Sequence, residues 1–164
     1  MFLTQGALAN ESGKKGEIST LKLLNLLGFK PQKLSYKPAN SEPKVRKKRT
    51  DHYIPELGLV LENKHQDVPG TADQKLENEI FNATRNFTDA NLIPQGIEPI
   101  RHYAIVLSGK HWAKPGPSHK VRVARELIQV LKTMGEFQDL ETVRIILKEE
   151  LPQLIQEIGA ECDK

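Results

Sequence analysis

The sequence predicts an α/β domain in which helices flank a mixed central β-sheet. Several segments carry apolar residues at helical spacing, and short apolar runs such as residues 102–108 are typical of buried strands. Their order is a helix, three strands, a helix, a strand and then additional C-terminal helices, an alternation that favours the α/β class. With 164 residues, we expect one domain (1–164), with a core over about 14–134 and a C-terminal helical region over about 138–160.

The first helix is predicted over residues 17–27, because leucines recur at three- and four-residue steps until Gly28 provides a C-terminal stop. Glu17 falls on the same face as Leu21 and Leu24, which is an unusual place for a carboxylate. A strand is expected over 32–37. A polar loop with two prolines and a basic run over 44–49 come next.

Two further strands are predicted near 50–54 and 58–66, joined by a turn that contains Pro55 and Gly58. Thr71 and Gln74 fit a capping box and so predict a helix that continues through Leu76 and Ile80.

The second half begins with a buried strand over 102–109 and a helix over about 118–134. Residues 140–158 show leucine, valine and isoleucine at alternating three- and four-residue steps, which predicts a helical region with a kink or a new helix at Pro152. This ladder is interpreted as core, with a dimer interface as the second option.

The net charge of +3 is unevenly distributed. Residues 30–66 hold nine Lys and Arg against four Asp and Glu, whereas residues 136–164 hold three bases against eight acids. We therefore expect a polyanion to approach the first region, although such charge can also simply solvate a loop. The single Cys162 and the N-terminal residues without a signal pattern predict a cytoplasmic protein, and no apolar run predicts a membrane span.

The most informative cluster is Asp51, eleven residues before Glu62, with Lys64 two residues further on. Because side chains alternate along a strand, Glu62, Lys64 and Gln66 share one face and His65 lies on the other. Two carboxylates and an ammonium at one point suit metal-dependent hydrolysis of a phosphodiester. A structural cross-strand ion pair is the alternative.

Oxygen ligands favour Mg²⁺, for which we expect Mn²⁺ to substitute, and no organic cofactor is expected. A backbone carbonyl near Asn63 is a further ligand candidate. Zinc is disfavoured because the five histidines have no ligand spacing. Lys64 could position a water, help to deprotonate it, or offset charge in the transition state.

The residues Thr50-Asp51 and Glu62-Asn63-Lys64 resemble the PD-(D/E)XK nuclease superfamily, with Thr50 where the family often has proline. The helix that opens at Lys14-Lys15-Gly16-Glu17 is similar to the acidic first helix of many members, including archaeal Holliday-junction resolvases. The segment 70–76 resembles one that follows the catalytic strand in several type II restriction endonucleases. The likeness covers roughly residues 14–110.

This resemblance implies a restriction-endonuclease-like core and a Mg²⁺-dependent DNA endonuclease, most like a type II restriction enzyme. It implies that Glu17 joins the metal shell, although the helix dipole alone could favour an acid at a helix start. Gln66 extends the motif to E-x-K-x-Q. The catalytic candidates are therefore Asp51, Glu62, Lys64, Glu17 and Gln66, and the metal candidates are Asp51, Glu62, Glu17 and Asn63.

Double-stranded DNA is the expected partner, and cutting both strands with one site per subunit predicts a homodimer. The candidate DNA contacts are Lys44, Arg46, Lys47, Lys48, Arg49, Lys75, Lys110 and Lys114. Lys75 could instead be a solvated lysine on a capped helix, and Trp112 a packing anchor. A Holliday-junction resolvase or a small homing endonuclease is the alternative enzyme, and a non-catalytic DNA-binding module is the alternative of another class.

Overall fold

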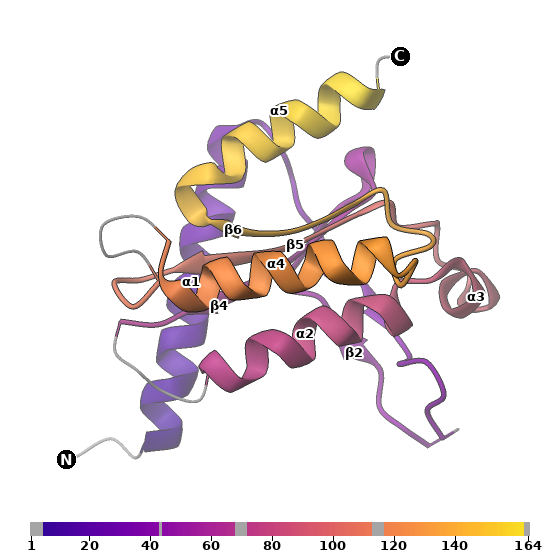
Figure 1. Cartoon of the computed structure of the whole chain (residues 1–164), viewed down its shortest axis with the longest axis horizontal. Helices are drawn as coiled ribbons and strands as arrows, with labels where there is room; N and C mark the ends of the chain where they lie inside the picture. The colour runs from indigo at the N-terminus through magenta and orange to yellow at the C-terminus, as the bar shows by residue number, and fades with distance from the viewer. Residues whose placement is uncertain (1–4, 43, 68–71, 113–116, 163–164) are drawn as a thin grey trace.

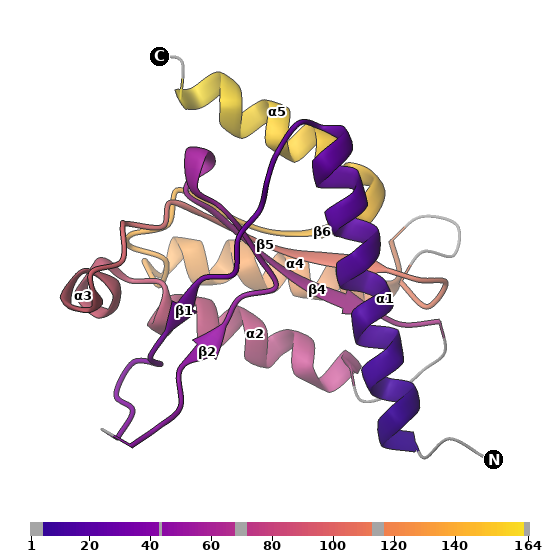
Figure 2. The same cartoon turned by 180° about the vertical axis from the view of Figure 1, so that it is seen from behind.

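The computed structural model places a mixed four-stranded sheet between two pairs of helices (Figures 1 and 2). It describes residues 5–42, 44–67, 72–112 and 117–162. In chain order the elements are α1 (Gln5–Leu26), β1 (Ser35–Tyr36), β2 (Lys48–Arg49), β3 (His52–Ile54), β4 (Leu59–His65), α2 (Ala72–Asn86), α3 (Asp89–Leu92), β5 (His102–Ser108), α4 (His119–Thr133), β6 (Thr142–Leu147) and α5 (Leu151–Cys162). This arrangement confirms the α/β class with a mixed, helix-flanked sheet.

The sheet has the strand order β3-β4-β5-β6. β3 and β4 are antiparallel, with His52 opposite Leu61, and the other two strand pairs are parallel. A single 3-10 turn over Pro55–Leu57 and the left-handed Gly58 (φ 54°) join β3 to β4. The two strands expected to carry the site are thus direct neighbours.

Side chains of β4 alternate between two hydrophobic cores. Val60 packs with residues of α2 and α4, whereas Leu59 and Leu61 pack with residues of α1 and α5. The predicted alternation is therefore correct, and it directs the even-numbered side chains of β4 toward α2.

Helix α1 begins well before the predicted residue 17 and runs from Gln5 to Leu26. Glu17 therefore lies in the middle of the helix, so the interpretation of Glu17 as an acid favoured by a helix start is wrong. Gly16 brings α1 close to the end of β4, because a Cβ at this position would lie 2.8 Å from the Cβ of His65. No local sequence pattern indicates this contact between distant segments.

A two-stranded hairpin of β1 and β2 precedes the main sheet, with Ser35 opposite Arg49. Of the strand expected over 32–37, Ser35 and Tyr36 form β1. Amides of α2 and of the segment after α3 hold the start of the hairpin loop, directly after β1: Gln95 Oε1 accepts from the Lys37 N–H at 2.7 Å, and Asn86 Oδ1 accepts from the Ala39 N–H at 3.0 Å. The hairpin is thus fixed to the domain near the C-terminal end of α2 (Figure 2).

The expected C-terminal helical region is wrong over residues 142–147, which form the edge strand β6. Four of these six residues, Thr142, Val143, Ile145 and Ile146, are β-branched and favour a strand, and the three- and four-residue spacing of the ladder is coincidental here. A 3-10 turn over Lys148–Glu150 and then α5 follow, with Pro152 as the second residue of α5, where proline is tolerated. Within the described ranges, no helix combines the length and apolar character needed to cross a membrane.

Candidate metal-dependent active site

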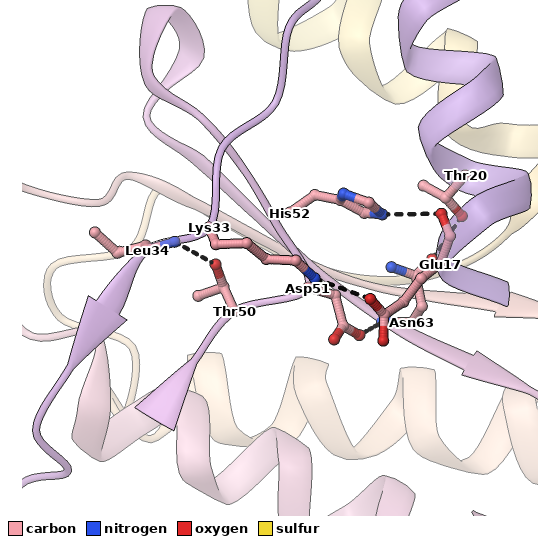
Figure 3. A network of polar contacts seen from close by, with 8 residues as sticks. All are labelled: Glu17, Thr20, Lys33, Leu34, Thr50, Asp51, His52 and Asn63. Atoms are coloured by element: carbon pink, nitrogen blue, oxygen red, sulfur yellow. Dashed lines mark hydrogen bonds and ion pairs between the residues drawn. The ribbon is translucent and has the colours of Figure 1, made fainter. Parts of the chain in front are cut away.

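Asp51 and Glu62 meet where β3 begins beside β4. Asp51 directly precedes β3, and Glu62 follows Leu61, the β4 residue that pairs with His52. The backbone N–H of Asn63 donates to Asp51 Oδ2 at 2.6 Å and so ties this carboxylate to β4 (Figure 3). The predicted pair of acids is therefore brought together by strand pairing and by one short hydrogen bond.

Both carboxyls lie in a partly buried environment that disfavours their charged forms. Burial raises the pKa of Glu62 well above its usual value; the charge of Asp51 raises it further, and Lys64 opposes the rise. Burial also raises the pKa of Asp51, against the hydrogen bond from Asn63. Two repelling carboxylates in such a place favour a nearby cation.

Lys64 supplies one such cation on the same face as Glu62. Its Nζ lies 3.1 Å from Oε1 of Glu79 on α2, with side-chain exposures of 18% and 25%. Burial acts to lower the pKa of Lys64, but Glu79 and Glu62 outweigh it and raise the pKa. Lys64 is therefore an ammonium at neutral pH, which favours the charge-offsetting role over the role of a base.

Glu79 is a site residue that the sequence interpretation missed. It follows Leu76 by three residues and precedes Ala83 by four, and both of these are buried. A carboxylate on the apolar face of a helix is the signal that singles out Glu17. The same signal is present at Glu79 in the helix over residues 72–86.

Glu17 reaches the site from α1 but is already paired. Its Oε2 lies 2.9 Å from Nζ of Lys33, a second residue that was missed (Figure 3). Both side chains line a surface pocket of about 180 Å³ together with Asp51 and His52. Since the Glu17 carbonyl can only accept, Nε2 of His52 donates to it at 3.2 Å and fixes this part of α1.

The side chain of Asn63 points to the opposite face of the sheet, where its Oδ1 accepts from the Thr20 hydroxyl at 2.5 Å. Any contribution to a metal must therefore come from its backbone carbonyl. Because the N–H and C=O of one strand residue project from the same edge, and the N–H meets Asp51, this carbonyl lies on the edge next to Asp51.

Gln66 lies just beyond β4 and is buried. Its N–H donates to the Ser108 carbonyl at 2.9 Å, and its Oε1 has no hydrogen-bond partner among the described residues. His65 contacts the Ser108 hydroxyl and Asp67 through its two ring nitrogens.

The donor set fits Mg²⁺ with few protein ligands. No group of three or more His, Cys, Asp or Glu side chains in the described ranges is arranged to hold a metal ion. Mg²⁺, however, binds through one or two carboxylates and completes its octahedron with water and phosphate oxygens. Asp51 and Glu62 meet that requirement, and Glu17 is engaged with Lys33 instead.

The basic run lies on the β1–β2 hairpin and leads directly into Asp51. All of its members are exposed. They are Lys44, Arg46, Lys47, Lys48 and Arg49. Lys110 is also exposed, at the far end of β5, whereas Trp112 is fully buried in the core and is a packing anchor. Thr71, Lys114 and the side chain of Lys75 fall outside the described residues.

Comparison with known proteins finds no match among family models, curated proteins or solved structures. A function can therefore be inferred from the residues of the site alone: two carboxylates, one partly buried ammonium and an adjacent basic hairpin.

Glu62→Gln should make the metal-free protein more stable at alkaline pH. Because the folded-state pKa of Glu62 is raised, the wild type loses stability as pH increases from the unfolded-state value through the folded one, and the variant does not. We expect a gain in the free energy of unfolding on the order of 1 kcal/mol at pH 8 and little difference at pH 4. Urea unfolding in EDTA measures both.

Glu157→Gln is the matched control. The Gln153 side chain and then Arg144 lower the pKa of Glu157, so this substitution should bring no gain at pH 8. An equal gain of stability in both variants would show that the gain comes from the change in net charge and not from the burial of Glu62. Added Mg²⁺ should raise the stability of the wild type more than that of Glu62→Gln.

Proposed function

We propose that this protein is a metal-dependent DNA endonuclease that hydrolyses phosphodiester bonds, of the type II restriction kind. The observation that carries the proposal is the position of Asp51, at the start of β3, beside Glu62 and Lys64 of the neighbouring strand β4 in a partly buried place. Two carboxylates that repel one another weaken a fold unless they bind a cation. A structural ion pair would need a single carboxylate beside Lys64, and Glu79 already meets that need.

In the proposed reaction, each of the site residues would have a separate role. Asp51 and Glu62, with the Asn63 carbonyl, would hold Mg²⁺, which when bound polarises the phosphoryl group and lowers the pKa of a bound water. Lys64, held by Glu79, presents an ammonium to the negative charge that develops on the phosphate oxygens. Gln66 has a buried amide two residues beyond Lys64, which would orient a polar partner.

The basic hairpin would bind the DNA backbone next to the site. Phosphate contacts come chiefly from Lys and Arg, and β2 ends two residues before Asp51. Because Asn86 and Gln95 hold the start of the hairpin loop, the charges of the hairpin are presented on a fixed frame. A two-fold dimer, which we propose as the active form, would bring one site to each strand.

The test is incubation of supercoiled plasmid with Mg²⁺ or EDTA, comparing the wild type with Asp51→Ala and Glu62→Ala. We expect Mg²⁺-dependent cleavage into discrete bands by the wild type alone. Cleavage that survives both substitutions would refute the proposal. Preference for a four-way junction over duplex of the same sequence would instead identify a resolvase, and DNA binding without any cleavage would identify a non-catalytic module.

Replacing Lys47, Lys48 and Arg49 with glutamine in one triple variant should weaken DNA binding and flatten its salt dependence. Each lost phosphate contact removes about 0.9 from the slope of log K against log salt, so the slope should fall by up to about 3. Binding to a labelled duplex at several salt concentrations measures this. The control removes the same charge from α4 by changing Lys120, Arg122 and Lys132, and a slope that falls equally in the control would remove the hairpin from the interface.

A further inference from the structure

The residues on either side of Lys33 are hydrogen-bonded along the start of β3, and this places Lys33 at the site. Gln32 forms a two-way backbone bridge with Tyr53, at 2.7 and 2.8 Å. Leu34 donates to the Thr50 hydroxyl and accepts from the Thr50 N–H, both at 3.0 Å. With both neighbours fixed to β3 and the residues before it, the backbone of Lys33 is held beside Asp51 (Figure 3).

The Lys33 ammonium lies within the field of three carboxylates. It pairs with Glu17 at 2.9 Å and lines the same pocket as Asp51. Burial raises the pKa of both Asp51 and Glu62, and in each case Lys33 is among the charges that oppose the rise. Lys33 is thus positioned where a metal ion held by these acids would act.

The ion pair also has the exposure expected of a replaceable contact. The side chains of Lys33 and Glu17 are 48% and 37% exposed, in contrast to the 18% and 25% of Lys64 and Glu79. An exposed pair contributes little stability and exchanges readily with solvent ions. Of the two lysines at the site, Lys64 is therefore the fixed cation and Lys33 the exchangeable one.

We propose that Lys33 is an internal counter-ion that competes with the divalent metal for Glu17 and, once displaced, binds a phosphate oxygen of the substrate. This inference rests on the proposed function of the site. It explains why the third acid is not grouped with Asp51 and Glu62, and it gives the pocket between α1 and residues 31–33 an anionic occupant. An ammonium beside a metal-bound phosphate adds a charge-assisted hydrogen bond.

The test measures Mn²⁺ binding by the loss of the free-ion electron paramagnetic resonance signal, on the full chain, for the wild type, Lys33→Met, Lys33→Arg and Asp51→Ala. Removing the competitor should tighten Mn²⁺ binding by Lys33→Met about threefold to tenfold, and Lys33→Arg should stay within about twofold of the wild type. At saturating Mg²⁺, plasmid cleavage by Lys33→Met should still fall about tenfold. Lys30→Met, in the same exposed stretch, is the matched control and should change neither quantity.

The outcomes separate the two proposals. Wild-type Mn²⁺ binding that Asp51→Ala abolishes, together with unchanged or weaker binding by Lys33→Met, would overturn the role of Lys33 and leave the nuclease proposal intact. Absence of Mn²⁺ binding and of cleavage in the wild type would overturn both. Circular dichroism monitors folding, and if Lys33→Met is unfolded, Lys33→Gln provides the second test: it removes the same charge from this half-exposed position and should tighten Mn²⁺ binding in the same way, whereas wild-type affinity would overturn the role of Lys33.

Discussion

Replacing Lys64 with methionine should lower the rate of Mg²⁺-dependent DNA cleavage about 10²- to 10³-fold, the cost of losing one charged group that stabilises a transition state. Methionine keeps the length and the apolar stem of lysine, so the core between β4 and α2 stays filled while the ammonium is lost. Glu62 and Glu79 also lose their shared cation, which costs stability. The rate should therefore be measured with supercoiled plasmid at a temperature where circular dichroism shows the variant folded.

Glu79→Gln separates the chemistry of Lys64 from its positioning. Because Glu79 is expected to act only by holding Lys64, its substitution should cost about tenfold, and the double variant should be no slower than Lys64→Met alone. Lys132→Met, on α4 and outside the site, is the control for loss of a lysine. If Lys64→Met cleaves within about twofold of the wild type, the ammonium has no part in the reaction and the motif is structural.

The parts of the site that lie close together in the sequence were predictable. Asp51 directly precedes β3 and Glu62 lies on β4, and one short turn joins these two strands, so their pairing brings the two acids near each other. The period-two alternation then places Lys64 beside Glu62 and His65 away from it. Charge entering the apolar strand β4 is the second signal, since charges are rarely buried without a partner.

The partners from distant segments were not predictable by the same means. Lys33 reaches Glu17 because residues 32 and 34 bond to β3, and nothing in the local sequence around Lys33 indicates that bridge. Gly16 allows α1 to approach β4, yet a glycine inside a helical pattern is equally consistent with a neutral choice. The strand β6 was missed because its apolar residues fit a helical period as well as a strand, and only pairing with β5 selects the strand.

Gly109→Ala should be the most destabilising small substitution near the site, by about 3–5 kcal/mol in the free energy of unfolding. Gly109 follows β5 with a φ of +100°, which L-residues rarely adopt, and an added Cβ would lie 2.3 Å from the Gln66 carbonyl oxygen. That carbonyl accepts from the His111 N–H at 3.1 Å, so it cannot turn away without losing a hydrogen bond. Urea unfolding of both proteins measures the difference.

Gly13→Ala is the matched control, because Gly13 lies within α1 and an added Cβ there would meet no described atom within 4 Å. This variant should gain up to about 1 kcal/mol from the helix preference of alanine. If Gly109→Ala changes stability no more than Gly13→Ala does, that result would contradict the close approach of Gly109 to the Gln66 carbonyl. If it is destabilised but still folds in the cold, the displaced Gln66 backbone should lower cleavage as well, because Gln66 directly follows β4, whose next-to-last residue is Lys64. The geometry of this one turn thus links the stability of the sheet to the position of the proposed catalytic strand.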